Sequence, residues 1–288
     1  MPRRGFATAM GAVAVVLWGA LALFTTGTAG LPPLQVLFLS FSLAFLGGLV
    51  WLALRGRLSV SFLKSIPATA WALGVGGLFL YHLAYFIALK NAPPAEASLI
   101  AYLWPLLIVL FSALLPGEGL ARRHLLAACL GLAGAALLIL RGDGALAGDG
   151  NLLGYGAAIA CALIWSGYSV LNRTQAAVPT EAIAFYCGVV ALLGAGLHSA
   201  LESWVAPAPG QWLALVALGL GPVGLAFFVW DFGTKHGDLP LLGVLSYGAP
   251  VISTLLLVAF AGTAATPALM LGCALIVGAA LLAMKRRA

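Results

Sequence analysis

Long apolar runs recur along the whole sequence, and short segments that hold most of the charge, glycine and proline separate them. Each run is about 20 residues long, enough for a helix to cross a hydrocarbon core roughly 30 Å thick. The runs are continuous, whereas the strands of an outer-membrane barrel alternate apolar and polar residues. We therefore predict an all-α integral membrane protein with ten transmembrane helices. The predicted spans are residues 6–26, 33–54, 70–89, 95–115, 124–141, 152–172, 181–201, 211–231, 240–260 and 267–284.

The small number of charged side chains excludes a soluble domain of this size. Only 8% of the 288 residues are charged, against roughly 25% in soluble domains. A net charge of +6 would suit a nucleic-acid partner, but the basic residues are better explained as topology signals. The four cysteines lie inside apolar runs and form no C-x-x-C pair, so we expect neither a disulfide framework nor a metal site.

The distribution of lysine and arginine predicts the orientation of the chain. With the N-terminus in the cytoplasm and alternating spans, the inside segments hold all but two of the 14 basic residues. The exceptions are Lys90 and Arg141. Because Lys and Arg concentrate in cytoplasmic loops, we expect a multi-pass protein of the bacterial inner membrane with both termini in the cytoplasm.

An internal repeat relates the two halves of the chain. The matching pairs, at offsets of 144–147 residues, include Tyr102 and Tyr247, Pro105 and Pro250, Lys90 and Lys235, and Trp18 and Trp165. We predict one repeat at residues 1–143 and the second at 144–288, each with five spans. An odd number of spans makes the second copy enter the membrane from the opposite side. Such inverted repeats place a site at the midplane and support alternating access, which favours transport.

Two prolines interrupt equivalent spans. Pro105 lies in the fourth predicted span and Pro250 in the ninth. Proline removes a backbone donor and kinks a helix, so the freed carbonyls need partners in the protein or in a cavity. Either a static kink or a hinge explains the pair, and we select both prolines as candidate hinges.

Polar aromatic residues gather near the membrane midplane, although Trp and Tyr normally concentrate at the two interfaces. Their polar atoms need partners from protein, water or ligand. They either line a cavity or belong to a packed core, and we take them as candidate substrate-binding residues together with one nearby serine. The set is Trp18, Tyr81, His82, Tyr85, Tyr102, Trp104, Trp165, Tyr168, Ser246 and Tyr247.

Charged residues near the ends of the spans are candidate gates. We select Lys90, Lys235 and Asp231. No predicted span carries a carboxylate near its centre, so a buried acidic proton relay is not expected. Any proton coupling would have to use His82 or the edge pair of Lys90 and Asp231, and a facilitator fits equally well.

Catalytic and cofactor motifs are missing from the sequence. It contains no H-E-x-x-H motif and no P-loop. We therefore expect neither an enzyme nor a cofactor, and the expected partners are a small-molecule substrate and the lipid bilayer, with the chain acting as a monomer.

These features together resemble the EamA branch of the drug/metabolite transporter superfamily. Each half carries a tryptophan in its first span, a lysine and a proline around the turn into its fourth, and a Gly-Ala-Ala-Leu-Leu stretch in its fifth. Within the superfamily, Tyr81-His82-x-x-Tyr85 and Tyr102-x-Trp104-Pro105 resemble the bacterial aromatic amino-acid exporters. That resemblance implies efflux of Phe, Tyr and Trp, and of related flat amphiphiles, by alternating access.

Three alternatives remain open at this point. The same fold can export another metabolite or a drug. A membrane enzyme or signalling subunit would need a reactive constellation, and the sequence offers none. A channel would need a continuous polar pathway, which the scarcity of polar residues within the spans disfavours.

Overall fold

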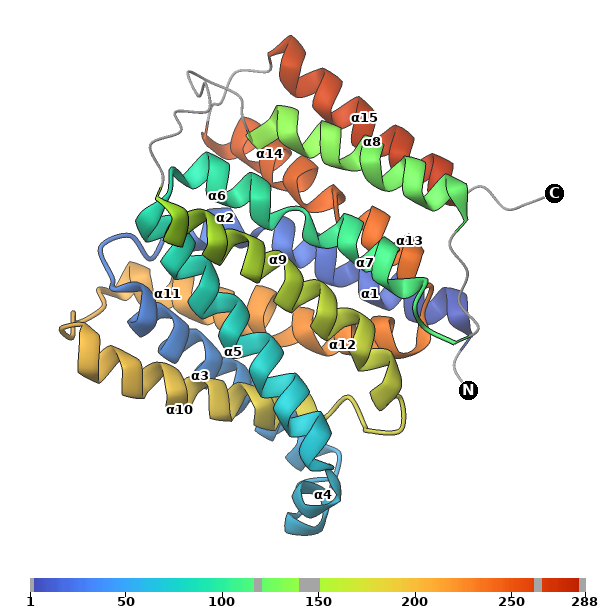
Figure 1. Cartoon of the computed structure of the whole chain (residues 1–288). Helices are drawn as coiled ribbons and strands as arrows, with labels where there is room; N and C mark the ends of the chain where they lie inside the picture. The colour runs from blue at the N-terminus through green and yellow to red at the C-terminus, as the bar shows by residue number, and fades with distance from the viewer. Residues whose placement is uncertain (1–2, 117–120, 140–150, 262–265, 285–288) are drawn as a thin grey trace.

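The computed structural model describes residues 3–116, 121–139, 151–261 and 266–284, and within these ranges the chain is helical with no strand (Figure 1). Helices are the expected outcome, because a backbone in lipid must satisfy its hydrogen bonds within its own segment. The elements are α1 Arg4–Gly19, α2 Leu21–Thr26, α3 Pro33–Leu54, α4 Val60–Ser65, α5 Ala68–Asn91, α6 Pro94–Ala101, α7 Trp104–Ser112, α8 Arg122–Ile139, α9 Leu152–Leu171, η1 Asn172–Gln175, α10 Ala182–Leu201, α11 Pro209–Leu218, η2 Gly219–Leu225, α12 Ala226–His236, α13 Leu239–Leu245, α14 Gly248–Ala261 and α15 Pro267–Met284.

Nine helical segments of the described chain are long and apolar enough to cross a membrane. They coincide with nine of the ten predicted spans, and the eighth continues to His236, five residues beyond its predicted end. A shorter apolar helix, Leu239–Ser253, occupies the position of the ninth predicted span. The prediction of an all-α membrane protein is thereby confirmed, while the count of ten and the orientation stay predictions.

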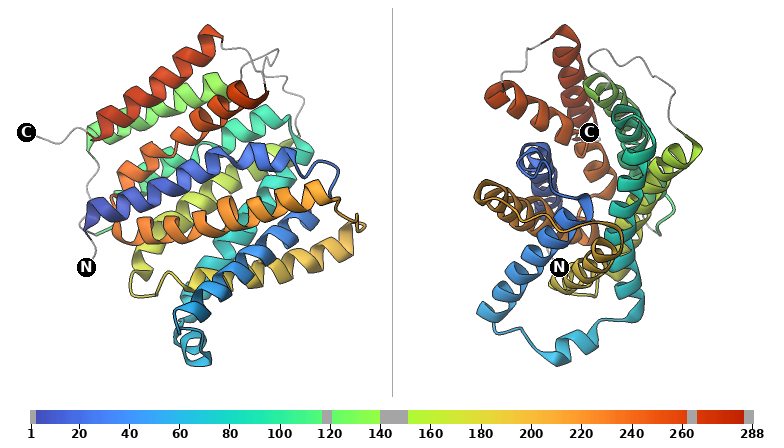
Figure 2. Two further views of the ribbon diagram at one scale, coloured as in Figure 1. Left: turned by 180° about the vertical axis from the view of Figure 1, so that it is seen from behind. Right: turned by 90° about the vertical axis from the view of Figure 1, so that its left-hand side faces the viewer.

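The most extensive helix contacts join the two halves of the chain. They pair α1 with α12, α3 with α10, α5 with α9, and α8 with α15. The first helix of each half thus packs against the third span of the other half, and the fifth spans pack against each other (Figures 1 and 2). This reciprocal pairing is the arrangement expected of two copies related by a two-fold axis, and it puts the core at the junction of the halves.

One end of the bundle, which we call the basic end, contains the start of α1 and the end of α12. Arg4 lies 3.6 Å from Asp238 in an ion pair, and Arg173 donates to the carbonyl of Gly237 over 2.6 Å. On the same side Arg57 forms an ion pair with Glu181. These contacts connect the loops that follow α3, α9 and α12.

The opposite end is held by side chains that cap backbone groups. The carboxylate of Glu202 accepts from the amides of Leu34 and Gln35, over 3.1 and 3.2 Å. It thereby satisfies donors in the first turn of α3 that have no partner within the helix. The side chain of Gln35 in turn bonds both backbone groups of Val205.

The fourth and ninth predicted spans are broken into two helices rather than kinked. Residues 102–103 separate α6 from α7, and residues 246–247 separate α13 from α14. Pro105 lies in the first turn of α7. The N–H groups of a first turn have no acceptor within the helix, so the N–H that proline lacks costs no hydrogen bond there. The two breaks lie 144 residues apart, so the repeat seen in the sequence is also a repeat of helix discontinuities.

Two further irregularities have no counterpart in the predicted spans. The first span changes direction at Ala20, between α1 and α2. In the eighth span, η2 is a π-helical segment that contains Pro222. Proline offers no N–H to the regular ladder, and such π-helical turns occur frequently at functional sites.

Candidate functional site

Four tryptophans from four different helices meet at the junction of the halves, and we call them the tryptophan cluster. Trp18 of α1 lies with its ring centroid 5.5 Å from Trp165 of α9 and 5.0 Å from Trp230 of α12. Trp104 of α7 lies 5.9 Å from Trp230 and 6.3 Å from Trp165. Most of these pairs are edge-to-face or tilted, the geometry that aromatic rings prefer.

The indole nitrogens of two of these rings have partners inside the protein. Trp18 Nε1 donates to the carbonyl of Pro222 over 3.1 Å, so the ring is attached to the π-helical segment. Trp230 Nε1 donates to the Ser169 hydroxyl over 3.1 Å. Because an unpaired N–H is costly away from water, these two bonds hold both rings in one orientation.

The polar aromatic residues of α5 extend the tryptophan cluster on one side. The ring of Tyr81 lies 5.1 Å from that of Trp165 and parallel to that of Tyr85. The Tyr85 hydroxyl is 3.2 Å from the Ser98 hydroxyl on α6. His82 contacts the carbonyl of Leu78 through Nδ1 at 2.7 Å, which leaves Nε2 as the ring nitrogen free for another partner.

Phe41 and Phe227 complete the surroundings of His82. The imidazole lies edge-on to Phe41 at 5.1 Å and to Phe227 at 6.2 Å. The ring of Phe227 also lies 5.8 Å from that of Trp165. His82 therefore lies between aromatic rings, with no acidic residue among these contacts.

Not all of the residues selected from the sequence lie around the tryptophan cluster. Tyr168 does, with its ring 5.3 Å from Trp165. Tyr102 and Tyr247 belong instead to a second core cluster formed by α7, α8, α13 and α15. Ser246 is buried and donates to the carbonyl of Leu242 in its own helix. The second cluster adjoins the helix breaks.

Trp230, Phe41 and Phe227 were not selected from the sequence as site residues. Trp230 lies one residue before the end of the eighth predicted span. The repeat offset of 145 residues would have found it, since it places Trp230 opposite Tyr85 and Phe227 opposite His82.

Two surface cavities lie at the basic end, away from the tryptophan cluster. One, of about 440 Å³, is lined by α4, Arg57 and Pro179. The other, of about 340 Å³, is lined by Trp51, residues 176–181 and the outer side of α12. In the tryptophan cluster itself Trp104, Trp165 and Trp230 are buried, while Trp18 and Tyr81 are half-buried.

The candidate gate charges are arranged differently from the expectation. Lys90 and Asp231 form no pair, because they lie at opposite ends of the bundle. Lys90 is exposed in the last turn of α5, next to Asn91, whose carbonyl accepts from Asn151 just before α9. Asp231 bonds Asn172, just after α9, and a 20-residue helix spans about 30 Å.

The partner of Asp231 is Lys235, one turn further along α12. Asp231 Oδ2 and Lys235 Nζ are 2.9 Å apart, and both side chains are buried. Within the described residues no group of three or more His, Cys, Asp or Glu side chains is placed to hold a metal ion.

The EamA-like transporter family matches residues 5–140 and 152–285 of the chain. This chain belongs to the EamA-like transporter family. Its relatives include the aromatic amino acid exporter YddG of Ancylobacter novellus, which is 51% identical over 97% of each chain. The Escherichia coli protein of the same name is 28% identical over 87% of each chain. The pseudopaline exporter CntI of Pseudomonas aeruginosa is 28% identical over 78% of this chain and 77% of its own.

A solved crystal structure has the same fold throughout. It matches with a TM-score of 0.92 and 50% sequence identity, and the match covers 98% of each chain. Membership of this family, together with the apolar helices, makes the chain a multi-pass membrane transporter with a small-molecule substrate. The resemblance to EamA proteins that the sequence suggested is confirmed.

Proposed function

We propose that this chain exports aromatic amino acids across the bacterial inner membrane by alternating access. The observation that carries the proposal is the tryptophan cluster, which draws one ring from each of four helices at the junction of the two halves. The relative from Ancylobacter novellus, named an aromatic amino acid exporter, supports this substrate class. We infer that the chain acts as a monomeric transporter and not as an enzyme.

The four tryptophan rings can make with an aromatic substrate the contacts that they now make with one another. An aromatic pair contributes about 0.5–1.5 kcal/mol beyond the burial of its surface. A substrate ring that separates two of the tryptophans replaces one such pair by two. The exchange is therefore favourable for an aromatic side chain and much less so for an aliphatic one.

Polar groups beside the tryptophan cluster are suited to the backbone of an amino acid. Because His82 Nδ1 donates to the carbonyl of Leu78, Nε2 of the neutral ring can accept from an ammonium group, and the Tyr81 hydroxyl can donate to a carboxylate. The ring faces of Trp165 and Tyr81 add attraction for the ammonium group. These groups lie on α5 and α9, a helix pair that joins the two halves.

The breaks in the spans supply the flexibility that alternating access requires. Each break leaves two residues between helices, at positions 102–103 and 246–247. A proline follows each break, Pro105 and Pro250. In this proposal the half-helices α6 and α13 tilt against α7 and α14, and the basic end faces the cytoplasm because Lys and Arg gather there.

An efflux assay with labelled phenylalanine in liposomes tests the proposal. We expect Trp104→Ala and His82→Ala each to lower the rate at least about tenfold, the equivalent of 1.4 kcal/mol of binding energy. Trp51→Ala is the matched control, because Trp51 is exposed and stacks on Arg55 outside the tryptophan cluster. Unchanged efflux in both cluster variants would refute this binding site.

A second candidate is export of another small metabolite on the same fold. The relative named a pseudopaline exporter favours it, since that name describes a non-aromatic cargo on a similar chain. A competition panel against labelled phenylalanine distinguishes the two candidates. Running the counterflow with and without a pH gradient also separates proton-coupled from facilitated transport.

A further inference from the structure

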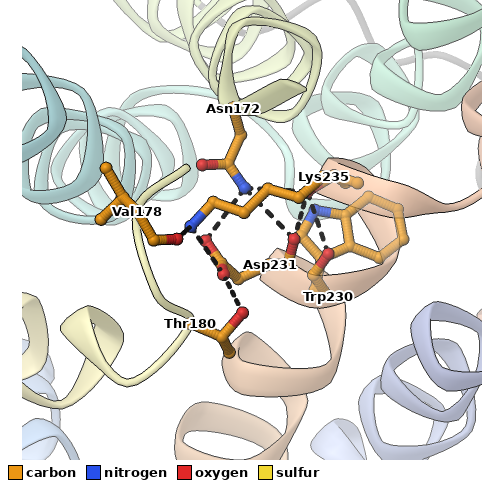
Figure 3. A network of polar contacts seen from close by, with 7 residues as sticks. Asn172, Val178, Thr180, Trp230, Asp231 and Lys235 are labelled. Carbon is orange, nitrogen blue, oxygen red and sulfur yellow. Dashed lines mark hydrogen bonds and ion pairs between the residues drawn. The ribbon is translucent and has the colours of Figure 1, made fainter. Parts of the chain in front are cut away.

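A buried polar network lies at the basic end, next to Trp230 of the tryptophan cluster (Figure 3). Asp231 follows Trp230 in the chain and is its centre. Its carboxylate accepts from Asn172 Nδ2 over 3.0 Å and from the Thr180 hydroxyl over 2.6 Å. The ammonium group of Lys235 donates to the carbonyl of Val178 over 2.9 Å.

The network connects three separate segments of the chain. Asp231 and Lys235 belong to α12, Asn172 opens η1 after α9, and Val178 and Thr180 belong to the loop before α10. The ion pair itself lies within α12, at i and i+4. The bonds that hold one segment to another are therefore those to Asn172, Val178 and Thr180.

Both charges of the network are withdrawn from water. The side chain of Lys235 is 2% exposed and that of Asp231 is 1% exposed. Burying an ion pair costs as much as it returns in stability, so a contribution to folding does not by itself account for the pair. An ionisable residue within a transmembrane segment is by default a functional candidate, and both residues lie within the helical segment Pro209–His236.

The positions related to Asp231 and Lys235 by the repeat do not form a second ion pair of this kind. The repeat offset of 145 residues places Phe86 opposite Asp231 and Lys90 opposite Lys235. Lys90 is exposed and forms no hydrogen bond or ion pair with the described residues. The two ends of a symmetric bundle are thus closed by unequal means.

We propose that this network is a latch that closes the basic end next to the tryptophan cluster and releases once in each transport cycle. Release separates α12 from Asn172, Val178 and Thr180, and water takes the place of the hydrogen bonds between them. The ion pair travels with α12, so neither charge is left without its partner in either state.

The latch rests on the alternating access of the proposed function and not on its substrate. It is tested by labelling cysteines from either side of the membrane with a maleimide that does not cross it. The background replaces Cys129, Cys161, Cys187 and Cys273 by alanine. One reporter is Val178→Cys in the latch loop, whose side chain is 8% exposed and whose carbonyl remains in place. The other is Ser98→Cys, beside Tyr85 and toward the opposite end.

The unlatched protein carries Asn172→Ala with Thr180→Val, which removes the hydrogen bonds from these two side chains to Asp231 and Thr234 and leaves the ion pair intact. We expect labelling of Val178→Cys from the cytoplasmic side to rise about tenfold, since these hydrogen bonds are lost from one state only. Labelling of Ser98→Cys from outside should fall about twofold as that state is depopulated. Thr180→Val alone is a near-isosteric change. It should change both labelling rates in the same directions, but by smaller factors.

The matched control is Thr174→Val, the same substitution at an exposed hydroxyl that donates to Leu171 in its own helical segment. It should leave both labelling rates unchanged. Unchanged labelling in the unlatched protein overturns the latch. So does a rise at Val178→Cys without a fall at Ser98→Cys, because that pattern means local loosening of the loop. The labelling uses no amino acid, so it can succeed where aromatic export fails, or fail where export succeeds.

Discussion

At the scale of single residues, the orientation of the tryptophan rings depends on hydrogen bonds from other helices. Trp230 is fully buried, and the Ser169 hydroxyl is its indole partner. Ser166, one turn earlier on α9, is equally buried but donates only to carbonyls of its own helix. Of these two serines, only Ser169 holds the Trp230 ring, and the sequence around them does not reveal this difference.

This difference gives a prediction for stability. Ser169→Ala should lower the free energy of unfolding by about 1–3 kcal/mol, because it leaves the Trp230 N–H buried without an acceptor. Ser166→Ala, the control, removes a hydroxyl without leaving another side chain unpaired, and it should change stability by less than about 0.5 kcal/mol. Thermal unfolding in detergent measures both, and equal losses would contradict the role given to Ser169.

At the scale of elements, spans of this protein are interrupted where the sequence places proline or small residues. The continuous helices α5 and α9 pack beside the broken span α6–α7, and α8 and α15 pack beside the broken span α13–α14. The break at residues 102–103 precedes Pro105, which therefore begins a helix instead of bending one. A proline in that position limits where the break can form without weakening the helix that follows.

The position of Pro105 predicts a small stability effect. Pro105→Ala should change the free energy of unfolding by less than about 1 kcal/mol, because the first turn of α7 needs no donor there. Leu107→Pro is the contrasting variant, since the Leu107 amide donates to Leu103 over 3.0 Å. Its loss inside the helix should cost about 3 kcal/mol or more. A large loss in Pro105→Ala would show that the break is not intrinsic to α7.

At the scale of the whole molecule, close contact between the halves depends on glycine. The fifth spans α8 and α15 lie side by side (Figure 2), and they approach each other at Gly134 and Gly272. A Cβ added at Gly134 would lie 2.7 Å from the carbonyl oxygen of Gly272. Small residues allow such approach of helices in lipid, where van der Waals packing drives association.

Gly134→Val should therefore force α8 and α15 apart and destabilise the protein by about 1–3 kcal/mol. Gly76→Val is the control, because a Cβ at Gly76 has no atom within 4 Å. Thermal unfolding of both variants in the same detergent tests the prediction. A control variant as unstable as Gly134→Val would mean that β-branching, and not the contact between halves, is responsible.

The sequence by itself determined the positions and lengths of the spans, because length and hydropathy are local properties of the chain. The apolar runs located the spans to within a few residues, and their matching residues revealed the repeat. The resemblance to EamA proteins also came from the sequence, because the residues that carry it recur in the same order in both halves. Among the candidate site residues, Trp18, Trp104 and Trp165 lie in one cluster in the structure.

The fourth member of the tryptophan cluster and the partner of Asp231 were decided only by the tertiary structure, because they depend on how the helices extend and pack. Trp230 joins the tryptophan cluster because α12 packs against α1. Asp231 pairs with Lys235 because α12 continues one turn beyond its predicted end, which puts the two charges on one buried face. The partners of Trp230 lie on other helices, as with Ser169, 61 positions away on α9. No pattern along a single helix contains such contacts.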